Sequence, residues 1–220
     1  LSVTTGTSNT LIGALAGDAI TTSANNVAVG TSALTTNILS AKNVALGVNA
    51  LKTHNQGSST ESFNVAVGHN AGESLTTAQY STIIGGEAGD AITTGDRNTI
   101  VGYDALGAEV AGNYNVAVGM QALRSQTNSS GTDTRNTAVG YQAGYNLSTG
   151  KQNTLLGSNV ASGDTITGDD NTCVGYAAGH ALTSGSNNLL LGHDAGRSTS
   201  PSGNLSTHSN IAVLGDDNIS

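Results

Sequence analysis

The hydrophobic and polar residues of the chain recur with a short, nearly constant period. Each repeat opens with Asn or Ser, here numbered position 0, has apolar residues at positions 2 and 3, and reaches Gly at position 4. Most successive starts are about 17 residues apart, and such a fixed short period indicates a solenoid. Eleven repeats begin at Asn9, Asn26, Asn43, Asn64, Ser81, Asn98, Asn115, Asn136, Asn153, Asn171 and Asn188, and a degenerate twelfth begins at Asn210.

Each repeat predicts one very short strand that ends at a corner. Position 3 is always Val, Ile or Leu, and position 4 is Gly in all eleven repeats. A short apolar run closed by Gly is typical of a strand, and Gly suits a corner that needs positive φ or a close backbone approach. Parallel stacking at ~4.8 Å per coil would make ten steps span roughly 48 Å. We therefore predict an all-β fold, a parallel β-roll or β-solenoid of coils of about 17 residues.

The domain organisation follows from the same count. We expect a β-roll domain over residues 1–209, and a terminal degenerate coil over residues 210–220 that leads into a domain beyond this sequence. In that last coil Gly215 falls one place late, which indicates a change of register. The chain also starts in mid-pattern, so we expect it to be part of a longer polypeptide.

Positions 2 and 3 are both apolar although they point to opposite faces of a strand. One face can form the interior of the coil. The other would leave a continuous exposed apolar stripe on a slender monomer, so it needs a second cover. Since the same face of another copy is the simplest cover, the sequence predicts a homo-oligomer.

Positions 8 and 11 compensate for each other in size. Where position 8 is Leu, position 11 is polar, and where position 8 is Gly, position 11 is Ile or Leu, with Gly196 as the exception. Close packing therefore predicts one large side chain per coil in a single pocket. From Asn26 the residues at position 8 are Leu, Leu, Gly, Gly and then Leu, Leu, Gly, Ala, which indicates a duplicated block of four coils. The polar partners of Leu34, Leu51, Leu106 and Leu123 are Asn37, His54, Glu109 and Gln126.

Three insertions rich in Ser, Thr, Asn and Gly interrupt the period, over His54–Ser62, Gln126–Arg135 and Thr199–Ser209. Insertions in solenoids become loops on one face, often the binding face. The first two come in the second coil of each block and should emerge on one side, four coils apart. Loops without any ligand are the equal alternative. The candidate binding residues are His54, Asn55, Gln56, Ser58, Gln126, Asn128, Ser129, Asp133, Asn204 and His208.

Composition and charge exclude several classes of function. The net charge is −8 with only seven Lys and Arg and no basic cluster, which argues against a nucleic-acid partner. No apolar run approaches the ~18 residues needed to cross a membrane. The single Cys173 cannot form a disulfide within one chain, and its apolar position 2 predicts a buried, reduced thiol.

The chain carries no recognisable catalytic or metal-binding pattern. It has no nucleophile elbow, phosphate loop or paired catalytic carboxylates, and its five His share no metal-ligand spacing. Asp169-Asp170 and Asp216-Asp217 are paired acids typical of solvated turns, and the adjacent Thr pairs put only one Thr on each face of a strand, unlike an ice-binding array. We expect no enzyme activity and no cofactor. The Asn residues at position 0 are expected to form a stacked hydrogen-bonded ladder.

The repeat Asn136–Gly144, N-T-A-V-G-Y-Q-A-G, resembles the arrays found in phage tail fibres that carry an endosialidase-type C-terminal intramolecular chaperone domain. Asn171–Gly179 carries the same resemblance, with Cys173 and Ala177 departing from it. The pattern is also similar to the YadA-like head repeats of trimeric autotransporter adhesins. This resemblance implies a left-handed coil and a homotrimer.

The resemblance further implies an extracellular, virion-borne role. The expected function is a rigid segment of a trimeric tail fibre or similar appendage, whose polar loops contact a host-surface receptor or glycan. The alternative is the head of an adhesin on a bacterial surface. A polysaccharide depolymerase would need convergent carboxylates, and Asp104, Glu109, Asp133 and Asp164 share no position in the repeat.

Overall fold

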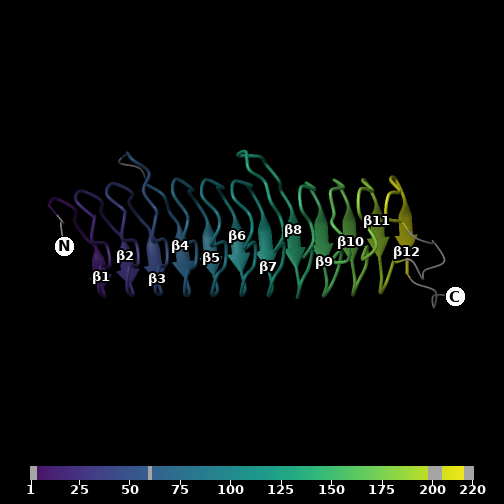
Figure 1. Ribbon diagram of the computed structural model, residues 1–220, viewed down its shortest axis with the longest axis horizontal. Coiled ribbons are helices and arrows are strands. Elements are labelled where there is room, and N and C mark those ends of the chain that lie inside the picture. Colours follow the sequence, from purple (N-terminus) through teal and green to yellow (C-terminus); the bar gives the residue numbers. More distant parts are fainter. Residues whose placement is uncertain (1–3, 59–60, 198–204, 216–220) are drawn as a thin grey trace.

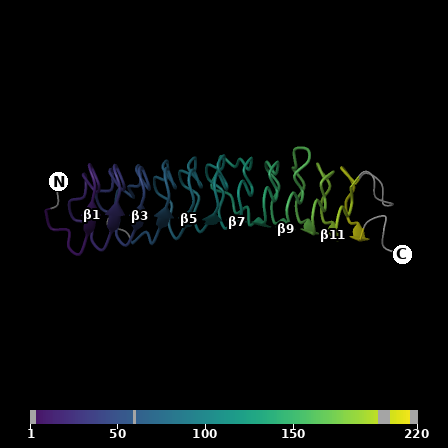
Figure 2. The same ribbon diagram turned by 90° about the horizontal axis from the view of Figure 1, so that it is seen from below.

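The computed structural model describes residues 4–58, 61–197 and 205–215 of the chain. These residues form one parallel sheet of twelve three-residue strands in sequence order, and they contain no helix. Figures 1 and 2 show the resulting straight stack, so the predicted all-β parallel solenoid is confirmed. The strands are β1 (Thr10–Ile12), β2 (Val27–Val29), β3 (Val44–Leu46), β4 (Val65–Val67), β5 (Thr82–Ile84), β6 (Thr99–Val101), β7 (Val116–Val118), β8 (Thr137–Val139), β9 (Thr154–Leu156), β10 (Thr172–Val174), β11 (Leu189–Leu191) and β12 (Ala212–Leu214).

The interior of the coil is thin and is filled by small and medium apolar side chains. Position 2 lies inside every regular coil after the first, as Ala28, Ile83 and Leu190 show at 0 % exposure, and the Ala of position 7 lies beside it. Positions 1 and 3 flank position 2 and point outward, because successive strand residues alternate between faces. The predicted two-sided strand is therefore confirmed, with position 2 facing inward and position 3 facing outward.

The position 0 side chains form the predicted ladder. In each step the side-chain oxygen of one coil accepts the backbone N–H of position 0 in the next, as from Asn26 to Asn9 at 2.9 Å and from Asn115 to Asn98 at 2.8 Å. Ser81 takes part through its hydroxyl, which accepts the Asn98 N–H at 3.3 Å. Most side-chain amides donate across the coil, as from Asn64 to the Ala78 carbonyl at 2.8 Å, whereas the buried Asn115 amide has no partner. The ladder thus satisfies buried polar groups that would otherwise cost stability.

The Gly residues at position 4 stack directly over one another at the corner. Gly102 has a φ of +141°, and a Cβ on it would lie 2.4 Å from the Gly119 carbonyl oxygen in the next coil. Both the backbone conformation and the close approach exclude other residues. This corner explains why the repeat keeps Gly without exception.

One large apolar side chain fills a shared pocket in each coil, as the compensation of positions 8 and 11 predicts. Leu34 and Leu106 supply it from position 8, and Ile20 and Ile92 supply it from position 11. The coil with Ala161 at position 8 uses Ile166 instead, which is 1 % exposed. The apparent exception at Gly196 is also resolved, because Leu205 is 3 % exposed and its side chain lies against Gly196.

The last described coil changes register by one residue. Leu189 pairs with Ala212, and the N–H of Ile211 binds the Asn188 side chain at 3.0 Å, so Ile211 occupies position 0. The predicted start at Asn210 is therefore wrong by one residue, whereas the predicted change of register is confirmed. Gly215 stacks on Gly192 as a result.

Candidate interaction surface

The outer face of the sheet consists of four rows of side chains. Rows 1 and 3 come from the strands, and rows −1 and 5 flank them at the beginning and end of each strand, alternating with buried positions 0 and 2. Rows 1 and 3 are apolar or Thr. Several row 3 side chains are well exposed, including Leu46 at 45 % and Ile84 at 39 %. Long exposed apolar faces are typical of interaction sites.

Row −1 holds every residue that precedes position 0, and each of them has φ between 52° and 62°. This left-handed conformation costs about 1 kcal/mol for most residues, so the fold imposes it. The row comprises Ser8, Asn25, Lys42, Phe63, Tyr80, Arg97, Tyr114, Arg135, Gln152, Asp170, Asn187 and Asn210.

In six consecutive coils row −1 becomes a stack of rings and cations, which we call the cation–aromatic ladder. Phe63 and Tyr80 stack with centroids 5.8 Å apart and an angle of 15° between planes. The Lys42 ammonium lies 4.9 Å from the Phe63 centroid, Arg97 lies 5.3 Å from Tyr80 and 5.4 Å from Tyr114, and Arg135 lies 5.6 Å from Tyr114. The rings are sandwiched by neighbours on both sides, so they offer their edges rather than their faces to a partner.

Acidic side chains balance the charges of this ladder. Lys42 pairs with Glu61 at 2.7 Å, and Arg135 pairs with Asp133 at 2.7 Å. All four side chains are 38–58 % exposed, so each pair contributes less than about 1 kcal/mol to stability. The ladder is therefore a polarised but nearly neutral surface, suited to cation–π and hydrogen-bonding contacts.

Row 5, at the corner after Gly, is the second concentration of aromatic residues. Tyr103, Tyr141 and Tyr176 are 46–50 % exposed, and Met120 between the first two is 45 % exposed. Tyr176 stacks on His193 with centroids 5.2 Å apart. A hydrogen bond to Glu87 raises the pKa of the Tyr103 phenol, as does the negative charge of that carboxylate. Tyr and Met are residues enriched at protein interfaces.

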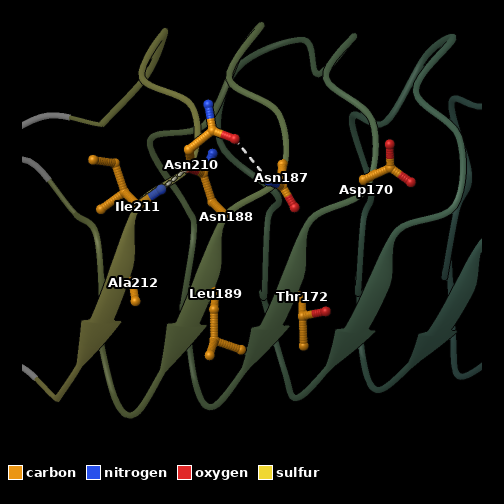
Figure 3. Close-up of a pocket in the computed structure, with 8 residues that line it drawn as sticks. All are labelled: Asp170, Thr172, Asn187, Asn188, Leu189, Asn210, Ile211 and Ala212. Atoms are coloured by element: carbon orange, nitrogen blue, oxygen red, sulfur yellow. Dashed lines mark hydrogen bonds between the residues drawn. The ribbon is translucent and has the colours of Figure 1, made fainter.

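A shallow groove of about 280 Å³ lies on the same face at β10–β12, where row −1 carries short polar residues (Figure 3). Asp170, Asn187 and Asn210 line its upper side, and Thr172 and Leu189 line its lower side. Asn187 donates to the Asn210 side-chain oxygen at 2.7 Å. The groove shows that rows −1 and 1 face the same way.

Three of the residues expected on binding loops lie inside the protein instead. His54 and Gln126 are 0 % exposed and Asn128 is 8 % exposed, so their prediction as surface contacts is wrong. His54 and Gln126 follow Leu51 and Leu123, whose large side chains fill the shared pocket. Position 11 therefore faces the interior even when it is polar.

Hydrogen bonds to the Glu109 carboxylate hold Gln126 and Asn128, at the base of the second loop, inside the protein. The Oε1 atom of Glu109 accepts the backbone N–H groups of Val110, Ala111, Gly112 and Asn128 at 2.8–3.1 Å. Its Oε2 accepts the side-chain amides of Gln126 at 2.7 Å and Asn128 at 3.1 Å. Six donors thus surround one fully buried carboxylate, which anchors the loop to the coil.

The remaining candidates that the structure describes are at least partly exposed, and the two loops that carry most of them project from the same edge, as Figure 1 shows between β3 and β4 and between β7 and β8. That placement confirms the prediction that both emerge on one side. Asn55 and Gln56 are half-buried, because the backbone N–H of Asn55 binds Thr76 and that of Gln56 binds Ser40. Asn204 lies outside the described residues. The exposed candidates are Ser58, Ser129, Asp133 and His208.

Besides Glu109, the titratable side chains of Cys173 and His54 are also buried in the coil interior. Burial raises the pKa of the Cys173 thiol to about 12, and Cys173 is 0 % exposed, as its position predicted. Burial lowers the pKa of His54 to about 4, and the nearby Thr76 backbone offsets this only partly. Neither ring nitrogen of His54 makes a well-formed hydrogen bond.

Within the described part of the chain, no group of three or more His, Cys, Asp or Glu is placed to hold a metal ion. No helix among those residues is long and apolar enough to cross a membrane.

The repeat count overlooked row −1. When each repeat is numbered from its Asn, the residue before that Asn falls at the end of the preceding repeat, in a turn of variable sequence. The signal was present in the sequence as Lys42, Phe63, Tyr80, Arg97, Tyr114 and Arg135, which precede position 0 in six consecutive repeats.

Comparison with known proteins yields no relative: no family, curated protein or solved structure matches the chain.

Proposed function

We propose that this chain is a rigid segment of a trimeric tail fibre of a phage or a similar virion appendage, with a left-handed coil. Its polar loops contact the surface of a host cell, where glycans are the receptor class. The observation that carries this proposal is a straight parallel solenoid with one long apolar face and two loops on a common edge.

The dimensions of the outer face favour assembly. From β1 to β12 the face is about 53 Å long, and rows −1 to 5 cover about 20 Å. The product, about 1,000 Å² per chain, exceeds the roughly 800 Å² that each partner buries in a standard stable interface. Covering this face removes exposed Val, Ile and Leu side chains from water.

The same dimensions favour three chains. Three faces about 20 Å wide, arranged as a triangular prism, place each backbone about 6 Å from the common axis. That distance is close to half of the ~10 Å spacing between packed sheets, so side chains fill the centre. Four such faces would leave each backbone about 10 Å from the axis and the centre hollow.

The loops suit multivalent attachment. Ser58, Ser129 and Asp133 are exposed polar residues on loops that are anchored at their bases. Three chains would present six such loops, and several weak contacts to a repetitive glycan combine into high avidity. Hydroxyl, amide and carboxylate groups form the hydrogen bonds that sugars offer.

Deletion of residues 129–132 tests the role of the second loop. The deletion restores the usual repeat spacing between Asn115 and Asn136 and keeps Asn128 as a ligand of Glu109. We expect an unchanged trimer in sedimentation equilibrium and at least a tenfold loss of binding to host cells or their isolated surface polysaccharide. Full binding by the deleted protein would exclude this loop as the contact.

The adhesin-head alternative uses the same geometry, and the same binding assay separates the two. A tail fibre binds bacterial surface polysaccharide, whereas an adhesin head binds the matrix or cells to which a bacterium attaches. Release of soluble oligosaccharide during the incubation would contradict both and indicate a depolymerase.

A further inference from the structure

We infer that row −1 of one copy packs against row 5 of the neighbouring copy at the same coil, so that the cation–aromatic ladder is half of an interface between chains. This inference rests on the proposed assembly and adds which residues meet. It concerns the two rows that flank the apolar centre of the outer face, and its occupant is a second copy of this chain.

The geometry of closed rings requires this pairing. In a cyclic assembly whose symmetry axis is parallel to the solenoid, corresponding coils of all copies lie at the same position along that axis. The strands then follow one another head to tail around the axis. The end of one strand, with row 5, approaches the beginning of the next, with row −1, and this contact is heterologous in the sense that two different patches meet.

In three coils the residues of the two rows are complementary. Arg97 would meet Tyr103 and Arg135 would meet Tyr141, which are two cation–π pairs of the kind that stabilise interfaces. Tyr80, with an exposed ring, would meet Gly86, which has no side chain.

The exposure of these groups fits a surface that awaits a partner. Tyr80, Tyr103 and Tyr141 are 46–50 % exposed, and the Arg97 and Arg135 side chains are 45 % and 58 % exposed. Arg97 and Arg135 stack on rings of their own chain, so their planar groups are already oriented. Ordering them costs little additional entropy on assembly.

Cysteine cross-linking tests the pairing directly. The full chain carrying Arg97→Cys and Tyr103→Cys is oxidised mildly with oxidised glutathione and run on a non-reducing denaturing gel. Residues 97 and 103 are joined by an extended segment of up to about 20 Å, whereas a disulfide needs Cα atoms within ~7 Å, so a link within one chain is excluded. Cys173 stays in place, because its buried thiol, with a pKa raised to about 12, does not react.

We expect most of the protein to run as a covalent trimer, and each single variant to yield only a background level of linked species. The pair Arg135→Cys with Tyr141→Cys, two coils away, should behave identically and guards against a local folding defect in the first pair. The matched control is Arg97→Cys with Tyr141→Cys, which places the same residue types about 10 Å apart along the axis and should not link.

The outcomes separate this inference from the proposed function. A disulfide-linked dimer from the matched cysteine pairs would support the contact between row −1 and row 5 but overturn the proposal of three chains. A trimer in sedimentation without links at either matched pair would overturn the pairing and leave the trimer standing. A monomer in sedimentation that does not link would overturn both, and links in the mismatched control would overturn the register.

Discussion

At the scale of single residues, burial decides the chemistry more than residue type does. His54 and Gln126 occupy the same place in the two blocks, and both are fully buried. Gln126 donates to Glu109 and accepts from Asn136, whereas neither ring nitrogen of His54 makes a well-formed hydrogen bond. An unsatisfied buried polar group lowers the free energy of unfolding by about 1–3 kcal/mol. His54 is therefore a destabilising defect of the first block, which Gln126 avoids at the same place in the second.

This defect predicts a loss of stability in acid. The pKa of His54 is about 4 in the folded protein and 6.5 in an unfolded chain. The unfolded state therefore binds the proton first, and stability falls as the pH drops from about 6.5 to about 4. The loss reaches roughly 3 kcal/mol below that range.

The substitution His54→Gln should raise the free energy of unfolding at pH 5 and flatten its dependence on pH between 4 and 6.5. Urea denaturation at one fixed protein concentration measures both effects. The control is His208→Gln, an exposed position that should leave the curve unchanged. An equal pH slope in wild type and His54→Gln would contradict the assignment of this histidine.

At the scale of one element, the strand and its Gly corner act as a unit. The carbonyl of each corner lies where a Cβ of the preceding Gly would be, so every coil restricts the one below it. Each strand has only three residues, and its stability comes from neighbours rather than from its own length.

The substitution Gly102→Ala should therefore destabilise the stack by about 3 kcal/mol or more, since the added Cβ meets the Gly119 carbonyl and φ is positive. The matched control is Gly131→Ala, where a Cβ would meet nothing within 4 Å. We expect that control to change stability by less than about 0.5 kcal/mol. Similar urea midpoints for the two variants would show that the corner tolerates a side chain.

The shared pocket offers a test of compensation between two positions. Leu34→Gly alone should cost about 3 kcal/mol through the cavity it leaves, and Asn37→Leu alone should cost about 1–3 kcal/mol through overpacking. The double variant recreates the arrangement of Gly17 and Ile20, and because it still lacks the two Asn37–Ser40 hydrogen bonds, it should cost less than the sum of the two single changes. A double-mutant cycle by urea denaturation measures this coupling, and additive losses would argue against a single pocket.

At the scale of the whole molecule, the uncovered face sets the behaviour in solution. Val139→Lys places a charge in row 3, at a side chain that is 39 % exposed in a single chain. Burying that ammonium between copies is costly, so we expect the proposed trimer to dissociate in sedimentation equilibrium. Thr94→Lys, at an exposed position outside the four rows of the outer face, is the control and should leave the proposed trimer intact. A trimeric Val139→Lys protein would place the interface elsewhere.

The sequence by itself determined the repeating element, because a short constant period and an invariant Gly leave few ways to stack a chain. Position 0, position 4 and the pocket shared by positions 8 and 11 were all readable, since each is repeated in every coil. Because a position recurs in many coils, its structural role can be distinguished from chance variation in one coil. The hydrophobic pattern alone therefore places Ala28 and Leu34 inside.

Only the tertiary structure decided which polar residues lie inside and which exposed residues lie together. His54, Gln126 and Asn128 look like loop residues in sequence. Gln126 and Asn128 are held inside by hydrogen bonds to the buried Glu109 carboxylate, and His54 is buried because position 11 faces the coil interior. Tyr80, Arg97 and Tyr114 come from three successive repeats and become neighbours only when the coils stack. The physical reason is that burial and side-chain contact depend on distances between coils, which a one-dimensional pattern does not contain.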